Sequence, residues 1–531
     1  MHNKPVSSLH PAHVFLFLAI LFGGFIRLNP VLTASFPLND GGLFYTMVQD
    51  LQENGYRIPE TTRYNQLNLP YAYPPLSFYM AGLLSDLLGW ELLDIFRILP
   101  AIFSTLAIPA FYILAEKFTE KPEQAAIAAL IFALLPISFD WLIMGGGLTR
   151  APAFFFSLLT LHLIYLLYTR RRNADIVWTS VLAALTILCH PERALHTAVS
   201  AIVFFVFLDR SKTGFIRSLA VAGLTILLTS PWWLPIISYH GVDPFLAAGQ
   251  TGLYNIGGLI QLFKFDFTHE FGLQSIAALA LLGIFLCLSQ RSYFLPVWLA
   301  VIFISEPRSA PLFSSICVAL LASFTVNRFL AYLNRQEHSP TRVETNEHPF
   351  SSLASKLTFG VLFAQWMLSA LVTTQILTNT TTLSQADRAA FAWISTNTPP
   401  ESKFLILSGI ISLTDPTAEW FPALTERVSV ATVQGYEWDR NHNFDEIVAQ
   451  GRAVQECAYH DFSCLQAWME TNGTDIDYIY IRKLVTTGLL AQEIHTSALE
   501  DLLITKGLAR PVYQSHEVAV LEMQGMLEDG E

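Results

Sequence analysis

The chain has 531 residues, of which 52% are hydrophobic and only 14% are charged. Soluble domains carry about 25% charged residues, so the composition and its repeated long apolar runs exclude an ordinary soluble protein and indicate a polytopic membrane protein. The net charge of −12 disfavours nucleic acid as a partner.

Eleven apolar runs predict membrane-spanning helices. A helix that crosses the ~30 Å hydrocarbon core needs about 20 residues, so three of the runs are short for this role, at 176–189, 196–208 and 293–304. A twelfth run, 75–89, contains Asp86, and we interpret it as a helix that lies at the membrane interface. The eleven runs are 13–28, 98–116, 124–144, 151–168, 176–189, 196–208, 216–238, 272–289, 293–304, 311–332 and 353–377.

The positions of Lys and Arg predict the orientation, because these residues collect in cytoplasmic loops. With eleven spans and a cytoplasmic N-terminus, Lys117, Lys121 and the triplet 170–172 all lie inside. We therefore expect a multi-pass protein of the cell (plasma) membrane. Its transmembrane domain is residues 1–377, with a large outer loop at 29–97 that carries interface helices.

The C-terminal segment, 378–531, has the composition of a small α/β domain on the extracytoplasmic side. Its stretch "SQADRAAFAWISTNTPPESKFLILSG" indicates an amphipathic helix, a Pro-Pro break and a strand. From residue 384 onward the chain holds 22 acidic and 9 basic side chains, so this segment accounts for the net negative charge. Cys457 and Cys464 lie in it, and an exported compartment favours a disulfide between them over two free thiols.

The first loop opens with "TASFPLNDGGLFY", which places Asp40 in a turn just after the first apolar run. Asn39-Asp40-Gly41-Gly42 is good turn chemistry, and a helix cap or turn would explain the acid without any further role. The functional alternative is a carboxylate held at the membrane surface as a general base or a metal ligand.

The stretch "FDWLIMGGGLTRAP" ends the third predicted span and opens the fourth. Asp140 lies in an apolar run, where acids are usually paired or functional. Arg150 lies at a helix start on the outer side, which suits a phosphate. A structural pair between Arg150 and Asp140 is the alternative.

Two further outer turns carry arginine. "CHPERAL" contains His190, Glu192 and Arg193, and "SEPRSAP" contains Glu306 and Arg308. Local salt bridges without another role are the default interpretation of each pair. The alternative is that both turns face the Asp40 loop and bind an anionic lipid headgroup. The sequence has no P-loop, Rossmann fingerprint or G-x-S-x-G motif, which disfavours an ATP-driven pump and a serine hydrolase.

Together these features resemble the GT-C superfamily of membrane glycosyltransferases. They are a first span, a large outer loop with an early acid, the motif "YAYPPL" and the helix "FRILPAIFSTL". Within the superfamily, the chain is most similar to the protein O-mannosyltransferases, the aminoarabinose transferase of lipid A and family 39-like bacterial and archaeal enzymes. The stretches "ADRAAFAWISTNTPPESKFLI" and "EWFPALTERVSV" resemble the outer domain of uncharacterised members.

The resemblance implies a GT-C-like fold of about 11 transmembrane helices and a sugar donor on a polyprenyl phosphate carrier. Asp40 corresponds to the family's base, and the carrier phosphate would be bound by Arg308, with Arg150 and Arg193 as further candidates. Tyr73, His190 and Glu192 would belong to the substrate loops. A second acid usually stands at the outer start of the fourth span, but here that position reads "GGGLTRAP", which leaves Asp140 as the second catalytic candidate. No cofactor is assigned, and a divalent metal ion stays open.

The function implied is inverting transfer of a sugar from a polyprenyl-phosphate carrier to an acceptor hydroxyl on the outer face of the bilayer. The acceptor would be a lipid, a glycan or a protein. Two alternatives remain from the sequence. One is a non-catalytic transport or scaffold protein that presents an outer domain, and the other is an envelope-glycan polymerase or ligase.

Overall fold

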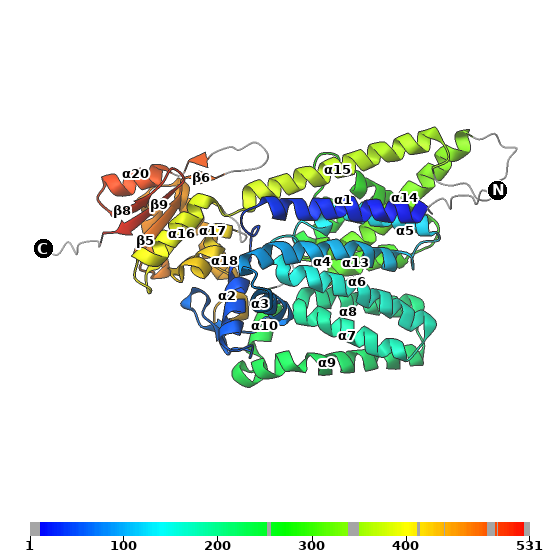
Figure 1. Cartoon of the computed structure of the whole chain (residues 1–531), viewed down its shortest axis with the longest axis horizontal. Helices are drawn as coiled ribbons and strands as arrows, with labels where there is room; N and C mark the ends of the chain where they lie inside the picture. The colour runs from blue at the N-terminus through cyan, green and yellow to red at the C-terminus, as the bar shows by residue number, and fades with distance from the viewer. Residues whose placement is uncertain are drawn as a thin grey trace.

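The computed structural model describes residues 11–251, 256–337, 350–410, 415–439, 441–485, 494–495 and 497–524. Most of the chain is a bundle of long helices that lie side by side, and a smaller region with a β-sheet packs at one end of the bundle (Figure 1). The bundle helices are α1 (Pro11–Thr33), α4 (Leu92–Ala115), α5 (Pro122–Leu134), α6 (Gly147–Arg170), α7 (Ala174–Cys189), α8 (Pro191–Leu208), α9 (Lys212–His240), α12 (Ser275–Ser289), α13 (Phe294–Ser305), α14 (Ala310–Glu337) and α15 (Leu353–Thr381).

Each of the eleven predicted spans corresponds to one of these helices. Among the described residues, seven helices are long and apolar enough to cross a membrane, namely α1, α4, α6, α8, α9, α14 and α15. The other four, α5, α7, α12 and α13, have 12 to 16 residues, which is fewer than the roughly 20 residues that a crossing needs. Length and composition therefore support a full crossing for seven of the eleven predicted spans, among the residues described.

The third predicted span, 124–144, is shorter than expected. Helix α5 ends at Leu134 and is followed by the 3-10 turn η2 (Pro136–Ser138). Proline disfavours helical geometry in the residue before it, and Leu135 accordingly has φ −74° and ψ 115°. The residues up to Gly146 then form turns, so Asp140 lies in a buried loop below the start of α6 and not inside a spanning helix.

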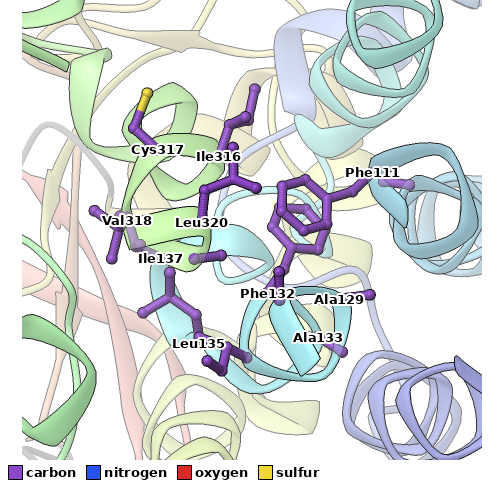
Figure 2. Packing of buried hydrophobic residues seen from close by; sticks show 14 of the residues in the cluster. Phe111, Ala129, Phe132, Ala133, Leu135, Ile137, Ile316, Cys317, Val318 and Leu320 are labelled. Atoms are coloured by element: carbon purple, nitrogen blue, oxygen red, sulfur yellow. The ribbon is translucent and has the colours of Figure 1, made fainter. Parts of the chain in front are cut away.

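The bundle core is made of side chains that interlock between helices. Phe111 of α4 stacks on Phe132 of α5, with ring centroids 4.4 Å apart, and both pack close to Ile316 and Leu320 of α14 (Figure 2). Small residues such as Ala129 and Ala133 let the neighbouring backbones approach, as is usual between membrane helices. The core therefore packs α4, α5 and α14 against one another.

Between α1 and α4 the first loop folds into compact elements. Helix α1 runs to Thr33 and α4 starts at Leu92, so the loop is slightly shorter than the 29–97 expected. The predicted helix at 75–89 is present as α3, packed against α2. The elements of the loop are α2 (Gly42–Glu53), β1 (Thr61–Thr62), η1 (Tyr64–Gln66), β2 (Leu69–Pro70) and α3 (Leu76–Leu88). A later loop adds α10 (Asp243–Gln250) and α11 (Ile256–Lys264).

The C-terminal region, residues 382–524, contains a five-stranded mixed sheet in the order β4-β3-β5-β9-β8. Strand β3 pairs in parallel with β4 and β5, whereas β9 pairs antiparallel with β5 and β8. The strands are β3 (Lys403–Leu407), β4 (Val428–Ser429), β5 (Tyr478–Arg482), β8 (Ala509–Gln514) and β9 (Val518–Met523), with the separate pair β6 (Leu484–Val485) and β7 (Ile494–His495). The helical elements are α16 (Gln385–Asn397), α17 (Pro416–Thr425), η3 (Tyr436–Trp438), α18 (Phe444–Glu456), η4 (Cys457–Tyr459), α19 (Phe462–Asn472) and α20 (Ser497–Thr505).

Alternation along β3 decides which elements cover each face of this sheet. Phe404 and Ile406 share a core with α16, α17 and the first loop, whereas Leu405 and Leu407 share one with α18, α19 and α20. The first of these cores also contains Leu43 of the first loop. The C-terminal sheet and the first loop are thus packed around one hydrophobic core. On the other face, Cys457 and Cys464 form a disulfide, with Cα atoms 5.5 Å apart.

Candidate active site

A cavity of about 720 Å³ lies where the bundle, the first loop and the C-terminal region meet. Helices α6, α8 and α14 all begin at this cavity, and α7, α9 and α13 end near it. Most of the residues singled out from the sequence line it, namely Asp40, Tyr73, Arg150, His190, Glu192, Arg193 and Arg308. Asp140 is buried just behind the wall, where its neighbour Trp141 and its partner His269 face the cavity.

Asp40 lies in a turn that is pressed against the triple glycine at 145–147. The Gly145 N–H donates to the Leu38 carbonyl at 2.7 Å, and the Gly146 N–H donates to Asp40 Oδ1 at 3.1 Å. A side chain at either glycine would overlap atoms of Asp40. The glycines therefore allow a close backbone approach, as the sequence suggested.

Arg150, in the first turn of α6, forms an ion pair with Asp40 through Nη2 and Oδ2. Its Nη1 donates to the Trp141 carbonyl at 3.0 Å, and its guanidinium lies 5.2 Å from the centre of the Trp141 ring. The alternative of a pair between Arg150 and Asp140 is wrong, because the chain after α5 turns Asp140 toward another partner. Both members of the Asp40–Arg150 pair are mostly shielded, with side chains 17% and 14% exposed.

Asp140 pairs instead with His269, in the loop before α12. Asp140 Oδ2 lies 2.6 Å from His269 Nδ1, and Oδ1 accepts from the Trp141 N–H at 2.7 Å. Burial alone would lower the pKa of His269, but the hydrogen bond and charge of Asp140 outweigh it and raise that pKa. The predicted second acid is therefore a buried partner of the cavity histidine His269.

Three arginines surround the cavity, each at or next to the start of a helix. Arg150 and Arg193 lie in the first turns of α6 and α8, and Arg308 lies just before α14. Helix starts carry partial positive charge. The guanidinium groups and the helix N-termini therefore both add positive potential to the cavity. The arrangement provides cations for an anionic group, in a cavity that is also lined by the acids Asp40, Glu192, Glu306, Glu419 and Glu437.

Arg193 is 2% exposed, and its contacts leave part of it unsatisfied. One terminal nitrogen donates to the Ser309 carbonyl at 3.3 Å and the other approaches Glu192 at 3.4 Å. Its Nε and the Nδ1 of His190 are buried without a hydrogen-bond partner among the described residues. Buried polar atoms normally have a partner, so these two atoms leave hydrogen-bonding capacity beside the cavity.

Arg308 is not neutralised by the local salt bridge that was its default interpretation. The Glu306 carboxylate accepts from the backbone N–H groups of Arg308 and Ser309, at 3.0 and 2.8 Å, and from the Ser309 hydroxyl. In the part of the chain that is described, no ion pair joins this carboxylate to the Arg308 guanidinium, which donates to the Thr251 carbonyl at 3.4 Å. Glu306 thus shapes the turn, and Arg308 stays exposed at the cavity.

The C-terminal region closes the cavity with Glu419, Gln434, Glu437 and Trp438. The Glu419 carboxylate accepts from the Gly41 N–H at 2.8 Å, and burial raises its pKa to about 7. Trp438 contacts the Tyr73 ring, whose hydroxyl lies 3.2 Å from that of Thr149. The sequence analysis did not select Glu419 or Glu437 as site residues. The sequence signals for Glu419 were its place at the start of the stretch "EWFPALTERVSV", which resembles the outer domain of family members, and its position as an acid among apolar residues.

Among the residues that the structure describes, no group of three or more His, Cys, Asp or Glu side chains could hold a metal ion. The cavity instead combines acids, three arginines and apolar walls that include Leu195, Trp232 and Phe267. Such a site can bind a molecule with an anionic head and an apolar body.

Solved structures with the same arrangement define the class of fold. The archaeal oligosaccharyltransferase AglB from Archaeoglobus fulgidus, in complex with an inhibitory peptide and a dolichol-phosphate, has a TM-score of 0.58 at 14% identity, over 89% of this chain and 69% of its own. ArnT from Cupriavidus metallidurans bound to undecaprenyl phosphate has a TM-score of 0.54 at 14% identity, over 98% of this chain and 99% of its own. The mycobacterial arabinofuranosyltransferase AftD has a TM-score of 0.54 at 14% identity over 100% of this chain, which spans only 41% of AftD.

The chain therefore has the fold of the GT-C membrane glycosyltransferases. Residues 70–334 match the model of a family described as a 6-pyruvoyl-tetrahydropterin synthase related domain, a membrane protein. The protein is accordingly a multi-pass membrane protein. No curated protein matches it in sequence.

Proposed function

We propose that this protein transfers a sugar from a polyprenyl-phosphate carrier to an acceptor hydroxyl at the extracytoplasmic surface of the membrane. The observation that carries the proposal is a single cavity in which Asp40 lies with Arg150, Arg193 and Arg308. The fold supports it, because two of the similar structures hold a dolichol-phosphate or undecaprenyl phosphate. The lining comes from one end of the bundle, which favours a one-sided site over a transport path.

In the proposed reaction the acceptor oxygen attacks the anomeric carbon, and the bond from that carbon to the phosphate oxygen breaks. Asp40 takes the proton of the acceptor hydroxyl, as a general base. The carrier phosphate leaves as an anion that needs cations and no added proton, and Arg193 and Arg308 supply the positive charge. Attack opposite the phosphate inverts the anomeric carbon.

The ion pair of Asp40 with Arg150 fits this scheme. An anionic donor head in the cavity competes for the Arg150 guanidinium, and a carboxylate that loses its cation becomes a stronger base. In this scheme Arg150 lowers the basicity of Asp40 before the donor binds, and Asp40 is most basic once the donor has bound. Behind the wall, Asp140 pairs with His269 and accepts from the backbone N–H of Trp141, the residue whose ring packs on Arg150.

The phosphate site is tested with undecaprenyl phosphate as the probe, added to the purified protein in lipid nanodiscs. Trp141, Trp232 and Trp438 line the cavity, so tryptophan fluorescence reports binding. Arg308→Ala is expected to weaken binding about 10-fold or more, because a hydrogen bond to a charged group is lost. Arg308→Lys recovers only part, since an ammonium group cannot make the forked contact.

The matched control is Arg335→Ala, at the other end of the same helix, which is expected to bind normally. Glu306→Ala separates a phosphate ligand from a structural arginine: under the proposal it changes binding little. Equal losses of stability in Glu306→Ala and Arg308→Ala, with unchanged affinity for undecaprenyl phosphate, would make Arg308 structural.

Transfer itself is tested with a panel of undecaprenyl-phosphate-linked monosaccharides and a membrane lipid extract as acceptor, by measuring released undecaprenyl phosphate. The proposal expects release from at least one donor of the panel, and none when Asp40 is replaced. Normal carrier binding with no release from any donor would favour the non-catalytic alternative.

A further inference from the structure

The turn that carries Asp40 is held from two opposite sides. On the bundle side, Gly145 and Gly146 donate their backbone N–H groups to it, as described above. On the other side, two consecutive residues of α17 bind the residues that flank Asp40. The Gly41 N–H donates to Glu419 Oε1 at 2.8 Å, and Trp420 Nε1 donates to the Asn39 carbonyl at 2.8 Å.

The fit between α17 and the turn leaves no space. A side chain at Gly42 would overlap the Glu419 carbonyl, and that same carbonyl accepts from the Tyr64 hydroxyl at 2.7 Å. Trp420 is fully buried, with its ring 4.8 Å from that of Phe36. The contact is therefore part of a packed core and not a loose approach of two surfaces.

Glu419 is unusual in this contact because it is a carboxylate, 5% exposed, at the wall of the cavity. Burial of an acid costs free energy unless its partners compensate. The groups that face it are the N–H of Gly41, the Arg150 guanidinium, the Glu437 carboxylate and the Tyr64 side chain. Its hydrogen bond of 2.8 Å to the first loop goes to the N–H of Gly41, the residue next to Asp40, and the Gly42 N–H also faces this carboxylate.

We propose that Glu419 is a positioning residue for Asp40: by binding the Gly41 N–H it fixes the turn that aims the Asp40 carboxylate into the cavity. The C-terminal region is then a working part of the active site and not only an attached domain. The inference rests on the proposed sugar transfer for its consequence, but the positioning itself can be measured without any reaction.

Hydrogen–deuterium exchange of the segment 36–46 measures the positioning directly. Glu419→Ala removes the acceptor of the Gly41 N–H, so exchange in this segment is expected to become at least 10-fold faster. Glu419→Gln retains a carbonyl that accepts the same N–H, and it is expected to exchange at nearly the wild-type rate. The control is Glu456→Ala, an exposed acid at the end of α18 in the same region.

In the transfer assay, Glu419→Ala is expected to lower kcat about 10-fold or more while the donor KM and the affinity for undecaprenyl phosphate stay unchanged, because Arg193 and Arg308 are untouched. Glu419→Gln recovers most of kcat. Unchanged exchange at 36–46 in Glu419→Ala would overturn the inference, as would faster exchange with full kcat. Absence of transfer by the wild type, with exchange altered as expected, would instead contradict the proposed function alone.

Discussion

Asp40 is not the isolated carboxylate that its sequence suggests, because Arg150 and the Gly146 N–H both hold it. A paired carboxylate is a weak base until its cation is drawn away, so under the proposed function Arg150 makes the basicity of Asp40 depend on an anionic ligand. This dependence on a ligand belongs to the pair of Asp40 and Arg150, which lie 110 positions apart in the sequence. Neither residue would have it alone.

Asp40→Asn is the direct test of the base. An amide keeps the size of the side chain and can still accept from Gly146, but it cannot take a proton. We expect transfer to fall by about 10²–10⁴-fold, the usual loss for a general base, while the fold is kept. The affinity for undecaprenyl phosphate should not fall, because the neutral amide no longer competes with the carrier phosphate for Arg150. Asp86→Asn, an exposed acid of the same loop, is the control. Turnover at the wild-type rate in Asp40→Asn would exclude Asp40 as the base.

At the scale of elements, the site depends on helix ends that meet. The break after α5 lets the chain form the Asp140–Trp141 turn and the triple glycine before α6 starts. The α17 segment then closes on the same turn from the C-terminal region. Each of these contacts uses a backbone group of the turn or of the triple glycine on at least one side, which explains why glycines recur at 41, 42, 145 and 146.

Gly146→Ala tests this close approach. A Cβ at this position would lie 2.7 Å from Asp40 Cγ and would overlap the carboxylate and the Arg150 guanidinium, so the turn must move. A displacement of about 1 Å at a reacting group can cost roughly 10²-fold in rate, and we expect a loss of that order in kcat. Gly223→Ala, in α9 with open space around the new Cβ, is the matched control. Equal activities of these two variants would show that the turn tolerates displacement.

Glu419 also predicts how stability depends on pH. Its pKa is raised from 4.5 to about 7, first by burial and then by the nearby Glu437, against the opposing effect of Arg150 and the Gly41 N–H. The folded protein therefore keeps a proton that the unfolded chain loses above pH 4.5, and this contribution to stability falls as the pH rises toward 7. Thermal unfolding should show wild type losing stability relative to Glu419→Gln across that range. Parallel pH curves for the two proteins would contradict the raised pKa.

At the scale of the whole molecule, the orientation predicted from Lys and Arg is open to a direct measurement. A membrane-impermeant protease added to intact cells is expected to remove the C-terminal region, because the charge bias places it outside. An epitope inserted at 171–173, between α6 and α7, should stay protected until the cells are permeabilised. Full protection of the C-terminal region would reverse the orientation and with it the proposed side of the reaction.

Much of this architecture could be predicted from the sequence, because apolar runs and charge bias are local signals. Each predicted span corresponds to a helix, and the turns that carry Arg150, Arg193 and Arg308 meet at one cavity. Pro136 was a local signal that α5 ends early. It lies inside a long apolar run, and for this reason the span was predicted to continue to residue 144. Glu419 could not be selected in this way, since an acid in an amphipathic helix usually faces water and its place depends on packing with the first loop.

The hydrogen bond between Gly41 and Glu419 joins positions 378 residues apart. A ribosome adds about 5–20 residues per second, so roughly 20–75 s separate the synthesis of these two residues. During that interval the nascent chain already has its first helix and its acid, but it lacks the segment that holds the acid in place. Under the proposed function, a protein truncated before α17 would thus be inserted in the membrane yet inactive, and sugar transfer would begin only after the last quarter of the chain is complete.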